Sequence, residues 1–231
     1  MCEPCFDLCT NDSKKLWRKG IVPYEFNKGV SKNLVRSVKK AMKKISIVST
    51  IRFVKKTDQL DYIEIVNKRG YWSYVGKRGG KQELSVTEGW PNPIGCAIHE
   101  LMHALGFYHE HCRPDRDKYV TVEDNIKENI NYKIIKESDA LCFGSYDYKS
   151  IMHYSLGPDM TSKQETDAQI GQRFQRFFWK STTSDDQRGF SGKSDAEKMI
   201  KRNKNNSGQG ITSRSNFLYL FVVGFYIVLL I

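Results

Sequence analysis

The stretch Ile98–His111, IHELMHALGFYHEH, contains four of the five histidines in this 231-residue chain. His99 and His103 are four residues apart, so on an α-helix they lie about 40° apart around the axis and one turn along it. Both imidazoles can therefore reach one ion, while Glu100 projects beside them, where it can hold a water. This is the H-E-x-x-H pattern, in which the histidines bind zinc and the glutamate is a general base.

A continuing helix would not bring a third histidine to the same ion, because His109 would lie about 240° around the axis from His103. Gly106 resolves this, since glycine adopts the left-handed conformation that ends helices and lets the chain turn back. Three protein ligands leave coordination positions open, which is typical of a catalytic zinc. From the H-E-x-x-H pattern alone, the alternative is an amphipathic helix whose histidines bind no metal.

A second motif follows further along the chain, where Ser150–Tyr154 reads SIMHY. A methionine in a tight turn beneath a three-histidine site is the other half of the metzincin pattern. Together, HELMHALGFYHEHCRPDRDKYV and SIMHY resemble the astacin family of zinc metalloendopeptidases. The resemblance covers about residues 16 to 205 and is densest between 94 and 154.

The resemblance implies one zinc ion per chain, with His99, His103 and His109 as ligands and Tyr154 as a weak fifth ligand. It implies that Glu100 is the base that activates a zinc-bound water, and that Tyr154 stabilises the oxyanion of the transition state. The chain is therefore expected to be an endopeptidase that hydrolyses peptide bonds in protein or peptide substrates.

Three further residues have structural roles by the same resemblance. Met152 packs beneath the site without binding the metal, and Gly106 turns the chain after the helix. Glu110 is expected to support the domain by engaging the mature amino terminus. His111 and His153 are interpreted as packed histidines that lie outside the metal site.

The periodicity of the remaining sequence predicts an α+β fold. Apolar residues at helical spacing predict a helix over residues 31–48, capped by Ser31, with a lysine-rich outer face. Strands are expected at 51–54, 62–66, 71–75 and 82–87, a second helix after Pro93, and a short helix at 194–200. Helices and strands mostly segregate, which favours α+β over repeated βαβ units.

The resemblance refines this fold to a metzincin-like catalytic domain of two subdomains with a zinc cleft between them. It implies a twisted, mostly parallel sheet with an antiparallel edge strand, together with the active-site helix. Gln82–Thr87 resembles the edge strand, against which an extended peptide substrate would add as a further strand.

The sequence divides into three regions. Residues 1–15 are a cysteine-containing segment without the apolar run of a signal peptide. Residues 16–205 form the astacin-like metallopeptidase domain. Residues 206–231 are a polar spacer and a hydrophobic tail, which is shorter than the about 20 residues of a spanning helix. The tail is typical of a cleaved glycolipid-anchor signal, and the alternatives are a short tail anchor or an artefact at the end of the reading frame. The expected location is extracellular or at the cell surface, with attachment to the membrane through this tail.

The six cysteines lie at positions 2, 5, 9, 96, 112 and 142. Six cysteines allow fifteen disulfide pairings, and the first three could instead be surface thiols or a thiolate metal site. Cys112 and Cys142 flank the segment after the third histidine, and a bridge between them is a hypothesis.

The resemblance also implies two core disulfides whose cysteines this chain lacks. Thr50, Tyr71 and Trp90 or Pro91 stand where three of those cysteines are expected, and none occurs near Asn205. Each missing bridge removes about 2–5 kcal/mol of stabilisation from a small secreted domain.

The formal net charge of +11 favours acidic partners or anionic surfaces. No nucleic-acid-binding motif accompanies it, so no nucleic-acid partner is predicted. The alternative to an active endopeptidase is a catalytically silent, membrane-anchored interaction module of the same family.

Overall fold

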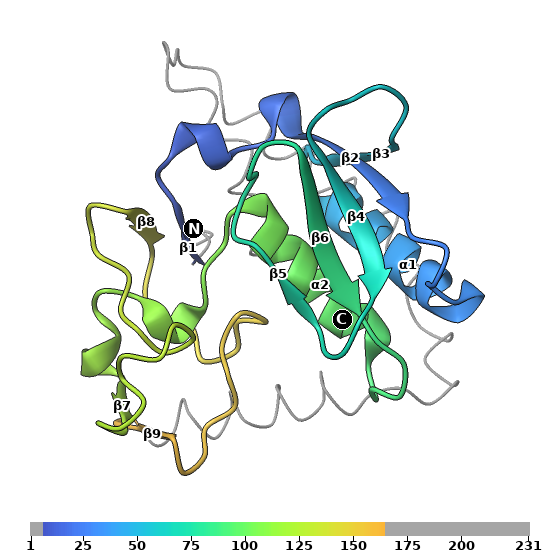
Figure 1. The fold of residues 1–231 in the computed structure, drawn as a ribbon. Helices are drawn as coiled ribbons and strands as arrows, with labels where there is room; N and C mark the ends of the chain where they lie inside the picture. The colour runs from blue at the N-terminus through green and yellow to red at the C-terminus, as the bar shows by residue number, and fades with distance from the viewer. Residues whose placement is uncertain (1–6, 165–231) are drawn as a thin grey trace, which may run out of the picture.

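The computed structural model describes residues 7–164, and the central sheet holds five strands within that range. They are β2 (Ile21–Phe26), β3 (Arg52–Lys55), β4 (Tyr62–Asn67), β5 (Trp72–Ser73) and β6 (Lys81–Val86). Their order is β3-β2-β4-β6-β5, and only the β5–β6 pair is antiparallel (Figure 1). The prediction of a mostly parallel sheet with an antiparallel edge strand is therefore confirmed.

The assignment of the edge strand to Gln82–Thr87 is wrong. These residues fall in β6, which pairs with β4 on one side and with β5 on the other. The antiparallel edge strand is β5, where Trp72 lies opposite Ser85 and Ser73 opposite Leu84, while β3 forms the other, parallel edge. Alternating side chains predict a strand but do not tell an inner strand from an edge strand, because the order in a sheet is set by tertiary pairing.

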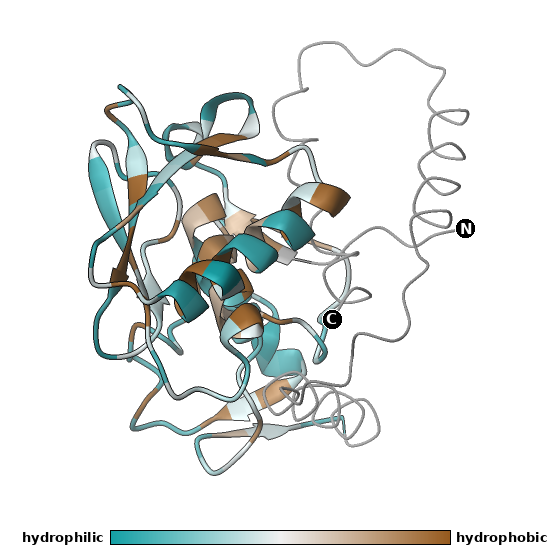
Figure 2. Ribbon diagram, turned by 90° about the vertical axis from the view of Figure 1, so that its right-hand side faces the viewer, coloured by the Kyte–Doolittle hydropathy of each residue, from teal (hydrophilic) through white to brown (hydrophobic). Residues whose placement is uncertain are grey.

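Two long helices cover the same face of this sheet (Figure 1). They are α1 (Lys32–Val48) and α2 (Pro93–Leu105), as the periodicity predicted. The Ser31 hydroxyl accepts the N–H of Leu34 at 3.2 Å and so caps α1. The buried face of α1 packs against α2, while its outward turns are mostly hydrophilic (Figure 2).

The chain after α2 forms a second part of the molecule with little regular structure. It contains η3 (Glu110–Cys112), η4 (Arg116–Lys118), β7 (Val120–Val122), β8 (Ala140–Phe143) and β9 (Met160–Ser162). The strands β7 and β9 pair antiparallel over their own small core of buried apolar and aromatic side chains. The predicted helix at 194–200 and the C-terminal tail lie outside the described residues.

The N-terminal strand β1 (Asp7–Thr10) joins this second part, ahead of the short helices η1 (Ser13–Lys15) and η2 (Arg18–Gly20). It pairs antiparallel with β8. On its other side, the Thr10 N–H donates to the Gly106 carbonyl oxygen and the Tyr108 N–H to that of Leu8, both at 2.9 Å. The end of the segment predicted as 1–15 is thus hydrogen-bonded to the chain that leaves α2.

The hypothesised bridge between Cys112 and Cys142 is wrong, because both are free thiols. Cys112 is buried, and its Sγ donates to the Asn131 carbonyl oxygen at 3.3 Å. Cys142 is exposed on β8, opposite Leu8 of β1. Cys2 and Cys5 lie outside the described residues.

Two aromatic rings meet at positions where the resemblance implies cysteines that this chain lacks. The rings of Tyr71 and Trp90 pack edge to face, with centroids 5.6 Å apart. The Tyr71 hydroxyl also donates to the Thr87 carbonyl oxygen at 2.9 Å. These contacts connect the start of β5 to the loop that precedes α2 without a covalent bridge.

Replacement of Tyr71 by alanine is expected to lower the free energy of unfolding by about 2 kcal/mol, since it removes both the ring pair and the hydrogen bond. Tyr71→Phe keeps the ring and should cost about 1 kcal/mol. The measurement is urea unfolding of both variants, of Trp90→Ala and of the double alanine variant. The double-mutant cycle gives the coupling free energy between the two rings. Strictly additive losses for Tyr71 and Trp90 would contradict a stabilising ring pair.

Candidate metal centre

The helix α2 starts and ends at residues that fix its position. The Asn92 side chain accepts the Gly95 N–H at 2.9 Å, and Pro93 occupies the first turn, where its missing N–H costs nothing. At the other end, the indole N–H of Trp17 donates to the Ala104 carbonyl oxygen at 2.8 Å. The helix is buried along most of its length, so its side chains have few alternative positions.

Gly106 ends α2 with a φ of 110°, the left-handed conformation expected of a helix-terminating glycine. Its N–H donates to the His103 carbonyl oxygen at 2.8 Å, and the Gly76 N–H donates to the same oxygen at 2.8 Å. A Cβ atom at position 106 would lie 3.0 Å from Thr10 Cγ2. The turn therefore requires glycine both for its conformation and for its contact with β1.

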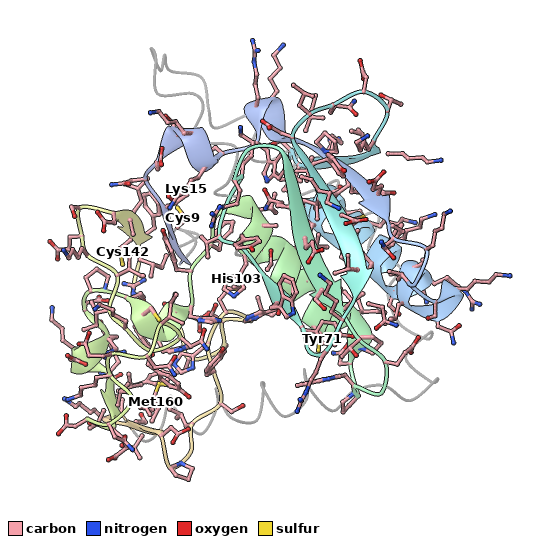
Figure 3. The ribbon with its side chains drawn as sticks, in the orientation of Figure 1. Cys9, Lys15, Tyr71, His103, Cys142 and Met160 are labelled. Atoms are coloured by element: carbon pink, nitrogen blue, oxygen red, sulfur yellow. The ribbon has the colours of Figure 1, made fainter. Side chains whose placement is uncertain are left out.

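The turn brings His109 back to the two histidines of α2. His109 Nε2 lies 3.1 Å from His103 Nε2 and 3.3 Å from His99 Nε2. His103 lies where the sheet and helices meet the second part of the molecule (Figure 3). The structure thus gathers the three predicted ligands around one point.

The protons of two of these rings are placed by backbone carbonyl groups. His99 Nδ1 lies 2.8 Å from the Ile151 oxygen, and His103 Nδ1 lies 2.8 Å from the Phe107 oxygen. A carbonyl oxygen only accepts, so each Nδ1 carries a proton and each Nε2 keeps its lone pair. Such outer contacts orient the histidine ligands of metal sites and raise their basicity.

Burial keeps the three rings neutral. It lowers the pKa of His99 to about 4 and that of His103 to about 3. The pKa of His109 is also well below its usual value, mainly through burial and then through the neighbouring His103. Neutral imidazole is the form that binds a metal ion.

The donor set fits zinc. Tetrahedral zinc with nitrogen ligands at about 2.0–2.1 Å places those nitrogens roughly 3.3 Å apart, which matches the Nε2 separations here. Three buried nitrogens clustered around His109, with Nε2 lone pairs on His99 and His103, suit a shared cation. A second group of donors, His109, His111 and Cys112, also lies close together. It does not suit a metal, because His111 Nε2 and Cys112 Sγ both donate to the Asn131 oxygen.

Glu100 is buried on α2 beside His99, with an exposed fraction of 6%. Burial raises the pKa of its carboxyl to about 8. A carboxylate with a raised pKa is a stronger base near neutral pH than an exposed one, and a bound cation would restore its charged form.

The SIMHY segment, Ser150–Tyr154, contacts the histidine cluster through its backbone and through the Tyr154 ring. The Ile151 carbonyl orients His99, and the Met152 carbonyl accepts the Glu110 N–H at 3.0 Å, next to the third histidine. Met152 itself is buried in the main core. The Tyr154 ring lies 4.5 Å from that of His109, centroid to centroid.

The surroundings of Tyr154 keep its hydroxyl protonated. Burial, followed by the charge of Glu100, raises the pKa of Tyr154 to about 12. At neutral pH the hydroxyl is therefore a hydrogen-bond donor.

Glu110 is almost fully buried, and its Oε1 accepts the Asp147 N–H at 3.0 Å. Arg113 Nη1 lies 3.4 Å from the same oxygen. Burial raises the pKa of Glu110 to about 8, while Arg113 opposes the rise. Within residues 7–164, Oε2 has no hydrogen-bond partner, and the predicted contact with a mature amino terminus stays a prediction.

Several supporting groups have no signal in the sequence motifs. The carbonyl groups of Ile151 and Phe107, the Trp17 indole and the strand β1 all hold the ligands or the turn between them. Backbone carbonyl groups occur at every position, so the sequence does not mark the ones that orient a histidine.

Gly106→Ala is expected to lower the free energy of unfolding by about 1–2 kcal/mol, because alanine is strained at this φ. The turn that delivers His109 should also shift, and zinc affinity should fall. The matched control is Gly79→Ala, where φ is 85° and nothing lies within 4 Å of an added Cβ. It carries the same kind of backbone strain, so its stability should fall while its zinc affinity, measured by chelator competition, stays unchanged. Equal zinc affinities in the two variants would contradict the role of Gly106.

The fold is that of a metzincin-like α+β domain, in which His99, His103 and His109 form a candidate metal-binding cluster. The family model of astacin, a family of peptidases, matches residues 9–199. The chain belongs to the astacin family.

Relatives and a solved structure agree with this assignment. Zinc metalloproteinase nas-6 of Caenorhabditis elegans is 41% identical over 143 residues, which are 60% of this chain and 41% of the relative. High choriolytic enzyme 2 of Oryzias latipes is 36% identical over 182 residues, which are 73% of this chain and 65% of the relative. The structure of High choriolytic enzyme 1, a hatching enzyme zinc-protease from Oryzias latipes, has a TM-score of 0.54 and 31% identity, and the match covers 75% of this chain and 94% of that one. The chain thus spans only part of its curated relatives' length.

Proposed function

We propose that this protein is a zinc-dependent endopeptidase that hydrolyses peptide bonds within protein substrates. The observation that carries the proposal is the convergence of three histidine Nε2 atoms, 3.1 and 3.3 Å apart, next to a buried glutamate. Zinc bound there lowers the pKa of a water molecule toward neutrality and polarises the carbonyl that is attacked.

Two residues of the chain act on the reacting atoms. Glu100 takes a proton from the attacking water and delivers it to the leaving amine, which is general acid–base catalysis. Tyr154 donates its hydroxyl hydrogen bond to the oxyanion that develops in the transition state. His99, His103 and His109 hold the metal, and the Ile151 and Phe107 carbonyls fix the first two rings.

The substrate is an extended peptide that pairs with the edge strand β5. This strand ends the sheet on the side of α2, and its outer backbone edge is where another strand can add. Backbone pairing binds the peptide chain irrespective of its side chains, which suits an enzyme that cuts within proteins.

The test is hydrolysis of dye-labelled casein by the full chain. Cleavage is expected, with loss on addition of o-phenanthroline and recovery when zinc is restored. An intact substrate in the presence of zinc-loaded protein would overturn the proposal and favour the catalytically silent module. Cleavage that is indifferent to the chelator would overturn the role of the metal.

The predicted regions and location belong to the same proposal. We place residues 16–205 as the catalytic domain and the protein outside the cell, attached to the membrane through residues 206–231. Among the helices of residues 7–164, none has an apolar stretch of the length that a membrane span needs. Release of the protein from intact cells by a glycolipid-specific phospholipase supports the anchor, while recovery only in the soluble cell fraction contradicts it.

A further inference from the structure

Two histidines outside the metal cluster hold the backbone of Tyr154 on both sides. The Tyr154 N–H donates to His111 Nδ1 at 3.2 Å. The Tyr154 carbonyl oxygen accepts a hydrogen bond from His153 Nδ1. Both imidazoles are buried, with exposed fractions of 0% and 2%. The imidazole end of each hydrogen bond is therefore shielded from bulk water.

The hydrogen-bond partners fix opposite tautomers on the two rings. His111 Nε2 lies 2.8 Å from the Asn131 carbonyl oxygen, so the proton is on Nε2 and Nδ1 is an acceptor. His153 has its proton on Nδ1, which faces the Tyr154 carbonyl, and its Nε2 accepts from the Tyr146 hydroxyl at 2.6 Å. Every ring nitrogen of this pair is thus engaged by a specific partner.

The ring of Tyr154 is confined as well. Its centroid lies 4.5 Å from that of His109 and 4.5 Å from that of His111. The rings of His109 and His111 are stacked, with centroids 5.0 Å apart. His111 therefore touches both the backbone and the ring of Tyr154, and it also lies against the third metal ligand.

We propose that His111 and His153 are positioning residues for Tyr154, which fix its backbone so that its hydroxyl meets the developing oxyanion. The inference rests on the proposed function, in which Tyr154 is the oxyanion donor. A displacement of about 1 Å at a reacting group costs up to about a hundredfold in rate. Loss of the hydrogen bonds that fix the Tyr154 backbone is therefore expected to lower the rate.

A matched pair of substitutions separates the two nitrogens of His111. His111→Asn keeps an acceptor near the place of Nδ1, whereas His111→Gln keeps a donor near the place of Nε2. Both side chains are polar and of similar size, so both variants are expected to fold. With dye-labelled casein, the kcat of His111→Gln should fall about tenfold and that of His111→Asn less than threefold, with little change in KM.

A double-mutant cycle tells whether His111 acts through the tyrosine. In a Tyr154→Phe background the hydroxyl is gone, so His111→Gln should lower kcat no further. The same loss in both backgrounds overturns the proposal, as do equal kcat values for the Asn and Gln variants. Loss of zinc from His111→Gln also overturns it, since His111 would then hold the ligand His109 instead.

A control variant tests whether the loss of kcat is specific to His111, and the Tyr154→Phe variant separates failure of the proposed function from failure of this inference. Tyr148→Phe removes the hydrogen bond from Tyr148 to the Tyr119 carbonyl oxygen in the same part of the molecule, so it should lower thermal stability and leave kcat unchanged. A Tyr154→Phe variant with full kcat refutes the oxyanion role of Tyr154, and the inference falls with it. A reduced kcat for Tyr154→Phe without coupling to His111 refutes the inference alone.

Discussion

Replacement of Glu100 by glutamine is expected to lower kcat about a thousandfold, the middle of the range for loss of a positioned general base. Glutamine has nearly the same shape but binds no proton at neutral pH. Glu100 lies one residue after His99 on a buried helix, so the substitution removes the proposed base and leaves the fold of α2 intact. The measurement is hydrolysis of dye-labelled casein under saturating substrate.

The same variant should keep its metal and its stability. A neutral amide is easier to bury than a carboxylate, so the thermal midpoint should not fall. Glu64→Gln is a matched control, because Glu64 is also largely buried but lies in the sheet, where it binds Asn27 and Lys81. Activity within tenfold of the parent for Glu100→Gln, at full zinc content, would show that another group is the base.

The histidine cluster was predictable because the residues that form it lie close together in the sequence. The spacing of His99 and His103 sets one face of a helix, and Gly106 sets the turn, so both features can be read within a dozen residues. The left-handed φ of Gly106 and the convergence of His109 follow directly. Helix α1 and the strands β3 to β6 followed in the same way from periodicity, whereas β1, β2, β7, β8 and β9 were not predicted.

The features that the sequence did not reveal depend on pairing between distant segments. Gln82–Val86 reads as a strand, but only the docking of Trp72–Ser73 makes β5 the edge instead. The strand β1 lies between β8 and the turn after α2, and no local pattern marks either partner. The thiols of Cys112 and Cys142 were paired by hypothesis because they flank the segment after the third histidine, yet both are free, Cys112 buried and Cys142 exposed.

Tyr71 and Trp90 show a further limit of predicting structure from a family resemblance. Their positions were recognised as sites of missing cysteines, which predicted only a loss of stability. The structure shows instead that two rings and a hydroxyl contact link the same segments. A resemblance identifies a departure from a family pattern, but only the packing shows what replaces the missing group.

Zinc is expected to raise the thermal midpoint of the metal-free protein by about 8–16 °C when free zinc is a thousandfold above its dissociation constant. Binding to the folded state alone stabilises it by about 4 kcal/mol at that ratio. For a protein of this size, each kcal/mol raises the midpoint by about 2–4 °C. The measurement is a thermal unfolding scan of chelator-treated protein with and without added zinc.

His109→Ala should remove nearly all of this shift, since the two histidines of α2 alone offer zinc an incomplete set of ligands. His153→Gln is the matched control: it also replaces a buried histidine of the second part, but His153 binds Tyr146 and the Tyr154 carbonyl and takes no part in the cluster. That variant should lose stability and keep the zinc-induced shift. A shift that survives in His109→Ala would mean that zinc binds elsewhere on the chain. Because the readout is unfolding, it tests the three-histidine site separately from the proposed catalytic roles of Glu100 and Tyr154.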